Sequence, residues 1–507
     1  MPRQPPPHPV LSSRVAAAEP GIDFRKLDIN YLGAFNDQWD RHKLHELSPH
    51  YLFMGATGSG KTTAMKLHMY SVFPHQDPRF SMRYRGLIYD PKSDLLSFLV
   101  RMGFTPDESV ILTNPFDRRS ASWNIASDIT SDADAQAFAE ILVQDHPGQE
   151  FWQTSARDII SSLVSGLNAE PQTRENWDLR DLVLIAGRQN LLVQVLKRTD
   201  QGRGALNDYF KGDKRLSGSI RATLRANLAP YRLIAAVWAH AKHSFTFKQW
   251  SRGAGIVLIG DHYKYRDPMR RVNNLLVRYA IDNVMDRPGV EEQDLSWFYL
   301  DELKNAGKFP NFGTMLTQGR SKGVRCVLAA QGLSTLQASF PEHEDKEVIN
   351  NCGNKCIMQL GSDEDARWAE RLFSTVTRVK ESRTRPIDQP DRGTKTTHEE
   401  KEPRLEAKDF LELPSAMNTG GSIHAYYHAP QGFYHTKAVP GDEVTASMPS
   451  PLTSPVVDFL PRPEEQFTLR PFARSDYDHL KLDPKSDSDD KDSDEEFKPF
   501  KISDRFR

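Results

Sequence analysis

The sequence predicts an α/β fold with a mainly parallel sheet and an inserted all-helical domain. A glycine-rich segment follows the apolar run at 50–54 and precedes a helical stretch. Short apolar runs then alternate with helical patterns, which is typical of parallel sheets built from βαβ units. Between about 131 and 241 the apolar residues recur almost only at three- and four-residue steps, which indicates helices without strands.

The glycine-rich segment reads Gly55-Ala56-Thr57-Gly58-Ser59-Gly60-Lys61-Thr62 and fits the phosphate-binding pattern G-x-x-x-x-G-K-[ST] at every fixed position. Glycines let backbone N–H groups turn inward around a polyphosphate, because residues without a Cβ can adopt positive φ. We expect Lys61 to reach the β- and γ-phosphates and Thr62 to bind Mg²⁺. A helix over 62–70, including Thr63, would add its dipole to the anion site. The alternative is a chance match in a glycine-rich turn.

The remaining elements are predicted in chain order from the apolar runs and from the turn-forming residues that bound them. We predict strands at 50–54, 87–89, 110–112, 255–259, 296–300, 324–330, 355–360 and 423–427, with helices at 268–286 and 310–319. The polar stretch 383–403 is expected to be an exposed loop. The predicted organisation is a leader at 1–22, a nucleotide-binding domain at 23–130 and 242–440, a helical domain at 131–241 and a tail at 441–507. Both ends are expected to be disordered, because prolines and then acidic residues dominate them.

Composition narrows the class of protein. Hydrophobic residues make up 38% and charged residues 26%, which is ordinary for a soluble protein, and no stretch approaches the roughly 18 apolar residues of a membrane helix. Three cysteines give no disulfide framework, so we expect a reducing cytoplasm. The net charge of −2 hides an acidic run at 483–496, and the remainder is mildly positive. That balance is compatible with a basic channel for nucleic acid but does not establish one.

A second acidic element is needed beside a phosphate loop, and Asp301 and Glu302 provide it at the end of an apolar strand. The physical logic assigns Asp301 to Mg²⁺, directly or through water, and Glu302 to the attacking water as general base. The alternative is a carboxylate pair that satisfies backbone donors at a helix N-terminus.

Two further candidates follow this pair. Gln331 ends a strand that should lie beside the Asp301 strand, where its amide would contact a γ-phosphate or the water. Arg320 lies in a Gly-Arg turn and is a candidate arginine finger, stabilising charge that develops during phosphoryl transfer. The alternative for Arg320 is a surface arginine with no catalytic role.

The residues around Asp301, Arg320 and Gln331 carry a family resemblance. The succession LDELKNAGKFPNFGTMLTQGRSKGVRCVLAAQGLSTL at 300–336 resembles the core of type IV secretion coupling proteins. These are RecA-like ATPases that feed DNA, or DNA–relaxase complexes, into conjugative transfer channels. The segments at 87–99, 110–124, 151–167 and 401–417 are similar as well, so the resemblance covers roughly residues 51–430.

The resemblance implies a RecA-like ATPase domain with an all-α domain inserted in it, assembled as a hexameric ring around a channel. It also implies ATP and Mg²⁺ as cofactors, bound by Lys61, Thr62 and Asp301, with Glu302 activating water. Gln331 would be the γ-phosphate sensor, and Arg320 the finger presented to a neighbouring subunit's nucleotide. The implied function is a DNA-stimulated ATP hydrolase and DNA translocase that delivers DNA or a DNA–relaxase complex to a secretion channel.

One feature departs from the family. Typical coupling proteins carry an N-terminal pair of membrane helices, and no such pair is found in this sequence. We therefore expect a cytoplasmic protein that is either recruited to the inner membrane by a membrane-anchored partner or repurposed as a cytosolic DNA motor, and the sequence does not choose between these. The acidic tail is either a docking site for a relaxase or accessory protein, or a solubilising tail.

Two alternative functions stay open. One is a soluble RecA-like DNA pump for packaging, segregation or defence. The other is a substrate receptor that holds nucleotide without translocating DNA. The full set of Lys61, Asp301, Glu302 and Gln331 argues against the receptor, because a structural nucleotide site needs neither a base nor a sensor.

Weaker features concern DNA, metal and the second strand end. A basic cluster in the helical insertion either contacts DNA phosphates or is a solvated helix surface: Lys211, Lys214, Arg215, Arg221, Arg225 and Arg232. Cys352 and Cys356 lack two further ligands at the usual spacing, so zinc is disfavoured. Asp90 and Lys92 follow a strand and either face a nucleotide or subunit boundary or form a structural ion pair.

Overall fold

The computed structural model describes residues 28–30, 41–43, 50–73, 84–106, 108–143, 147–288, 294–302, 312–340, 344–373, 375–384, 394–430 and 432–484. The chain forms two compact units. The first takes its described residues from Met1–Tyr84, Phe98–Gly103 and Pro288–Pro455, and the second from Arg85–Ser97, Phe104–Arg287 and Val456–Arg507.

The first unit alternates strands and helices along most of its length. Its elements are β1 (Asp28–Asn30), β2 (Arg41–Lys43), β3 (His50–Met54), α2 (Lys61–Val72), most of α3 (Leu96–Arg101), β9 (Leu295–Leu300), α15 (Phe312–Gln318), η4 (Gly319–Lys322), β10 (Val324–Ala330), α16 (Leu333–Ser339), α17 (Glu344–Asn351), β11 (Asn354–Ile357), α18 (Asp363–Leu372), β12 (Thr375–Thr384), β13 (Thr394–Pro403), α19 (Ala407–Leu411), η5 (Ala416–Asn418), β14 (Ile423–Ala429), β15 (Gly432–Val439) and α20 (Gly441–Ser447).

The strands of this unit form a sheet in the order β15-β14-β11-β3-β10-β9. β11, β3, β10 and β9 pair in parallel, whereas β14 and β15 add antiparallel strands at one edge. β3 is buried at all five residues and lies between two parallel neighbours, as its unbroken apolar pattern requires. The phosphate loop therefore leaves the interior of the sheet, at the carboxyl end of a strand that is held on both sides.

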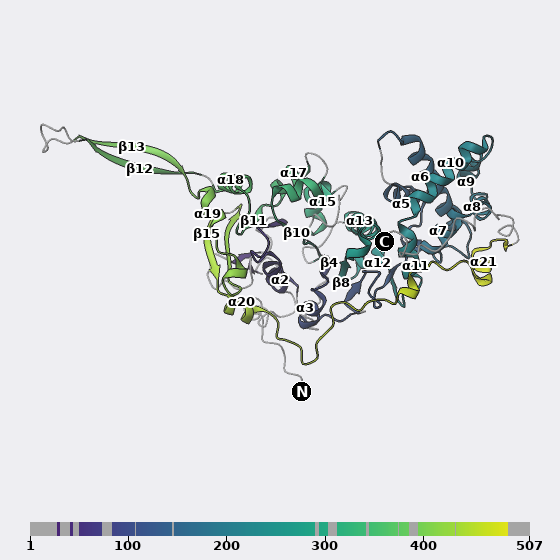
Figure 1. Ribbon diagram of the computed structural model, residues 1–507, viewed down its shortest axis with the longest axis horizontal. Helices are drawn as coiled ribbons and strands as arrows, with labels where there is room; N and C mark the ends of the chain where they lie inside the picture. The colour runs from purple at the N-terminus through teal and green to yellow at the C-terminus, as the bar shows by residue number, and fades with distance from the viewer. Residues whose placement is uncertain are drawn as a thin grey trace, which may run out of the picture. The chain divides into compact units, whose positions relative to one another are not determined.

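β12 and β13 form a long two-stranded ribbon (Figure 1), where the sequence predicted an exposed loop at 383–403. Their register is continuous from Thr375 opposite Pro403 to Thr384 opposite Thr394. Threonine recurs in both segments, and β12 also contains Val376 and Val379; these β-branched residues favour extended backbone. The prediction was wrong for residues 383–384 and 394–403, because the segments are polar and lack the alternating apolar pattern that marks a half-buried strand. Residues 385–393 of the predicted loop lie outside the described residues.

The second unit is mainly helical. Its elements are β4 (Tyr84–Asp90), β5 (Val110–Leu112), β6 (Ser122–Trp123), α4 (Ile125–Asp128), α5 (Asp132–Leu142), α6 (Glu150–Ala169), α7 (Leu179–Gly187), α8 (Gln189–Leu196), α9 (Asp200–Tyr209), α10 (Lys214–Leu228), α11 (Tyr231–Trp238), β7 (Ser244–Phe245), α12 (Phe247–Arg252), β8 (Gly255–Gly260), η3 (Tyr263–Tyr265), α13 (Arg266–Met285), η6 (Glu464–Phe467) and α21 (Arg474–Leu480).

Local capping explains where several of these helices begin. Ser131 and Asp178 each accept a hydrogen bond from a backbone N–H in the first turn, and Asp134 and Asp181 return the interaction to complete capping boxes. Burial of the Asp181 carboxyl, together with the negative charge of neighbouring Asp178, raises the pKa of Asp181 to about 8. Helical periodicity and caps agree over this region, and the described residues between 131 and 241 form helices joined by turns, as the periodicity indicated. β4, β8 and β5 pair in parallel in this unit, with β8 between the other two.

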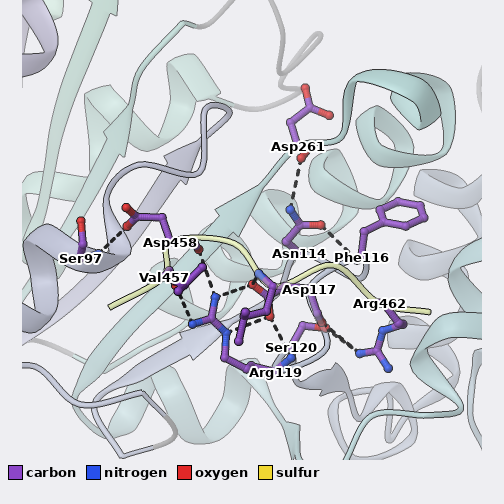
Figure 2. A network of polar contacts seen from close by, with 11 residues as sticks. Ser97, Asn114, Phe116, Asp117, Arg119, Ser120, Asp261, Val457, Asp458 and Arg462 are labelled. Atoms are coloured by element: carbon purple, nitrogen blue, oxygen red, sulfur yellow. Dashed lines mark hydrogen bonds and ion pairs between the residues drawn. The ribbon is translucent and has the colours of Figure 1, made fainter. Parts of the chain in front are cut away.

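The chain after residue 441 differs from the predicted disorder. It contains α20, η6 and α21, and the segment 457–462 is held against the loop after β5 (Figure 2). Asp117 and Arg119 form an ion pair at 2.6 Å, and Arg119 also donates to the carbonyl of Val457 at 2.8 Å. Buried Arg462 donates to the carbonyls of Pro115 and Asp117 at 2.8 and 3.1 Å. Within the tail that was expected to be disordered, Arg462 therefore binds backbone carbonyls of the second unit.

The predicted strands and helices correspond to observed elements, with end shifts of a few residues. The predicted leader at 1–22 lies outside the described residues, as does the acidic run after Pro484. The boundaries of the predicted domains stay predictions. Among the described helices, none has the length and apolar character needed to span a membrane.

Candidate nucleotide-binding site

The glycine-rich loop connects β3 to α2 and is shaped by its two positive-φ glycines. Gly58 has φ 80° and Gly60 has φ 107°, conformations that are costly for residues with a Cβ. Gly55 is needed for a different reason: a Cβ there would lie 2.6 Å from Ser59 Oγ and 2.8 Å from Met358 Cβ. Thr57 is exposed at the loop, and α2 begins directly at Lys61, which places Thr62 and Thr63 in its first turn. The predicted loop and helix N-terminus are therefore both present.

Lys61 folds back over the loop. Its Nζ donates to the carbonyls of Gly55 at 2.7 Å and Ala56 at 2.9 Å, and the residue is 8% exposed. The loop backbone is anchored by the amides of Gly55 and Ala56, which donate to Ala330 and Gln359. The ammonium group is thus held at the concave side of the loop, where a polyphosphate would replace carbonyl oxygens as its acceptor.

The acidic strand end meets the loop directly. Thr62 Oγ1 donates to Asp301 Oδ2 at 2.8 Å, although 239 positions separate the two residues in sequence. The other oxygen of Asp301 accepts the amide of Glu302 at 2.9 Å. Glu302 has φ 50°, in the left-handed region that costs about 1–3 kcal/mol for such a residue. Left-handed conformations of non-glycine residues cluster at functional sites, and Glu302 is the residue that directly follows Asp301.

Three strand ends converge at this edge of the sheet. Ala330 pairs with Met54 on one side of β10, and Leu328 pairs with Leu300 on the other. Gln331 therefore follows β10 at the level of Gly55, and Asp301 lies near the level of Ala329. Gln331 is exposed at this edge. The structure brings Lys61, Thr62, Asp301, Glu302 and Gln331 to one end of three adjacent strands.

Arg320 lies elsewhere. It is exposed in η4, which precedes β10, whereas Gln331 follows the same strand. Seven residues of extended chain span about 20 Å, so Arg320 and the phosphate loop lie at opposite ends of β10. Arg320 therefore cannot reach the phosphate loop of its own chain. A catalytic role for Arg320 requires the nucleotide site of another subunit.

Behind the site, His68 of α2 is a structural residue. Its Nδ1 lies 2.8 Å from the hydroxyl of Tyr299, and its ring packs against Tyr51 and Trp297. Burial lowers the pKa of His68 to about 3, so the imidazole stays neutral at physiological pH. It ties the helix that follows the phosphate loop to the strand that ends in Asp301.

Sequence reasoning missed a second wall of the loop. Met358 and Gln359, just after β11, contact Ser59 and the amide of Ala56. Ser415 Oγ donates to the carbonyl of Gly58 at 2.7 Å, and the amide of Met417 donates to the same oxygen at 3.1 Å. The matching segment 401–417 was a signal that this region belongs with the loop, but it did not show which residues touch it.

The basic cluster of the second unit divides by exposure. Arg225 is partly buried and donates to the carbonyl of Gly187 at 3.2 Å, at the C-terminus of α7, where a cation is favourable. Burial lowers the pKa of partly buried Arg232, and the positive charge of Arg188 lowers it further. Arg225 and Arg232 therefore fit neither sequence-based alternative well, because both side chains are partly buried against the protein. Exposed side chains remain around the start of α10: Lys211, Lys214 and Arg215.

The two weaker features have structural explanations. Cys352 and Cys356 are buried free thiols whose pKa values are raised by burial, and the described residues contain no His, Cys, Asp and Glu group suited to a metal. Asp90 is buried and accepts the amides of Asp94 at 3.2 Å and Leu95 at 3.0 Å, just before α3. It therefore organises the turn into that helix.

The residues at the loop fit a nucleotide with Mg²⁺. The glycine cradle has no room for a Cβ at Gly55, its lysine is held in place, and the hydroxyl of Thr62 with the carboxylate of Asp301 forms a set of oxygen donors. Oxygen donors of this kind suit Mg²⁺, which is usually bound by one or two protein groups together with substrate phosphates. When bound, the ion would neutralise charge on the phosphates.

Residues 43–438 match the family described as type IV secretion-system coupling protein DNA-binding domain. No curated protein matches the chain. Among solved structures, the bacterial conjugative coupling protein TrwBdeltaN70 in its unbound monoclinic form is similar, with a TM-score of 0.63 and 19% identity over 85% of this chain and 91% of that chain. The plasmid coupling protein TrwB in complex with ADP and Mg²⁺ is similar with a TM-score of 0.60 and 19% identity, over 83% and 90%. These similarities confirm the predicted α/β, RecA-like P-loop fold.

Proposed function

Because the chain belongs to the family of type IV secretion-system coupling protein DNA-binding domains, we propose that it is a DNA-stimulated ATPase that moves DNA, alone or joined to a relaxase, towards a secretion channel. The observation that carries the proposal is the hydrogen bond from Thr62 to Asp301, which joins the phosphate loop to the acidic strand end. TrwB crystallised with ADP and Mg²⁺ supports the same cofactors here.

In this proposal the loop amides and Lys61 bind the β- and γ-phosphates. Thr62 and Asp301, which share a hydrogen bond, would hold the magnesium ion, and the ion would neutralise phosphate charge. Glu302 accepts a proton from the attacking water, and Gln331 holds the γ-phosphate or that water in line. Arg320 acts on a neighbouring subunit's nucleotide, because it lies at the far end of β10 from its own loop. A ring of six subunits would supply that neighbour.

The alternatives are less well supported. A receptor without hydrolysis does not need Glu302 in a left-handed conformation beside Asp301. A DNA pump for packaging, segregation or defence would use the same site, and the family match favours conjugative transfer. We also propose a cytoplasmic location with a membrane-anchored partner, in keeping with three buried free cysteines.

The decisive experiment is the rate of ATP hydrolysis by the full chain with Mg²⁺, without DNA and with single- or double-stranded DNA. We expect hydrolysis that rises on addition of at least one form of DNA. Lys61→Ala, which removes the phosphate-binding ammonium group, controls for contaminating ATPases. Nucleotide binding without hydrolysis under all three conditions would favour the receptor instead.

A second prediction concerns the exposed cations at the start of α10. Replacing Lys211, Lys214 and Arg215 by Gln is expected to weaken DNA binding and to flatten its salt dependence. Each lost phosphate contact should reduce the slope of log K against log salt by about 0.9 for duplex DNA and about 0.7 for single strands. Fluorescence anisotropy of labelled DNA at several salt concentrations measures this slope. An unchanged slope would exclude these three residues as phosphate contacts.

A further inference from the structure

The segment 415–417 covers one side of the phosphate loop with an exposed thioether. Met417 is 82% exposed, yet a Cβ at Gly58 would lie 3.3 Å from both its Cβ and its Sδ. A single exposed methionine is ordinary on a protein surface. This one is different because its sulfur lies directly beside a glycine of the nucleotide-binding loop.

The contact is built rather than incidental. The carbonyl of Gly58 accepts two hydrogen bonds from this segment, one from buried Ser415 Oγ and one from the amide of Met417. Ala416 extends the same surface, since a Cβ at Gly60 would lie 3.2 Å from its Cβ and 3.4 Å from Ile423 Cγ1. Ala416 and Met417 thus form an apolar wall along the two positive-φ glycines of the loop, with Ser415 holding it in place.

The sheet order determines what this wall faces. The groups assigned to metal and water, Asp301 and Glu302, follow β9, which lies on one side of β3 beyond β10. Segment 415–417 precedes β14, which lies on the other side of β3 beyond β11. A nucleotide whose γ-phosphate points towards Asp301 has its nucleoside end away from it. That end then emerges on the side of Ala416 and Met417.

We propose that Met417 is a binding residue for the nucleobase, whose aromatic face packs against its thioether. Sulfur–aromatic contact is favourable, and methionine adapts its shape to different ring surfaces. The inference rests on the proposed function, because it requires the phosphates of a nucleotide to occupy the loop. It adds a site for the base, which the catalytic residues do not provide.

The test compares a ligand that has a base with one that lacks it. Isothermal titration calorimetry of the full chain with Mg²⁺ would measure binding of ADP and of inorganic tripolyphosphate. Met417→Ala is expected to weaken ADP about 3- to 10-fold and to leave tripolyphosphate unchanged. Met417→Leu, which keeps an apolar side chain, should lose less. Asn418→Ala, an exposed neighbour in the same turn, is the matched control and should change neither ligand.

The outcomes separate this inference from the proposed function. If the unmodified chain binds neither ligand, the base contact and the proposed function are both contradicted. If it binds both ligands but Met417→Ala weakens them equally, or weakens neither, the base contact is wrong while the phosphate site stands. A specific loss of ADP affinity supports the contact.

Discussion

Replacing Glu302 by Gln is expected to lower the rate of ATP hydrolysis by about 10²- to 10⁴-fold while leaving nucleotide affinity nearly unchanged. Glutamine has the same shape but cannot accept a proton from water at neutral pH. It also keeps the backbone chemistry of Glu302, whose amide donates to Asp301 Oδ1 at 2.9 Å, so the Thr62–Asp301 contact should persist. Only the step that needs a base is removed.

Single-turnover hydrolysis and ADP binding, measured on the same preparation, separate the two effects. Glu412→Gln is a suitable control, because Glu412 is an exposed carboxylate of the same unit, outside the catalytic set. The control should retain the full rate. A Glu302→Gln protein that hydrolyses ATP within a few-fold of the unmodified chain would show that another group activates the water.

Much of this site could be predicted because its signals are local. The loop needs glycines at fixed positions, and a buried parallel strand reads as an unbroken apolar run, so β3, β9 and β10 were visible in the sequence. Once these strands are placed in a parallel sheet, the polar residues after them must gather at one edge. The sequence alone therefore predicts that Asp301, Glu302 and Gln331 lie at the same edge of the sheet, and the strand register agrees with this placement.

Other parts depend on contacts between distant segments. Ser415 meets Gly58 because β14 adds antiparallel beside β11, and no periodicity in the sequence specifies that pairing. Arg462 looks like one more charge in a polar tail, yet it is 5% exposed and donates to backbone carbonyls near Asp117. Hydrogen bonds from long polar side chains to distant carbonyls leave no pattern in the composition, so such segments resemble disorder.

The second large expected effect is a loss of DNA-stimulated ATP turnover when Arg320 is removed. Arg320→Ala is expected to retain nucleotide binding and to lose DNA-stimulated turnover by about 10³- to 10⁵-fold, the range for an arginine finger. The loss should equal that of a catalytic residue even though Arg320 lies about 20 Å from the phosphate loop of its own chain. Lys322→Ala, in the same turn, is the control for a general effect of removing a cation from this surface.

A mixing experiment decides whether Arg320 acts between subunits. Glu302→Gln and Arg320→Ala proteins are each expected to be nearly inactive alone. In an equal mixture, a site formed by an Arg320→Ala subunit with intact Glu302 can receive Arg320 from a Glu302→Gln neighbour. Random assembly of a ring would complete about one quarter of the sites in this way, so turnover should reappear on mixing. If Arg320 acted within its own chain, every subunit would carry a lesion in its own site and mixing would restore nothing.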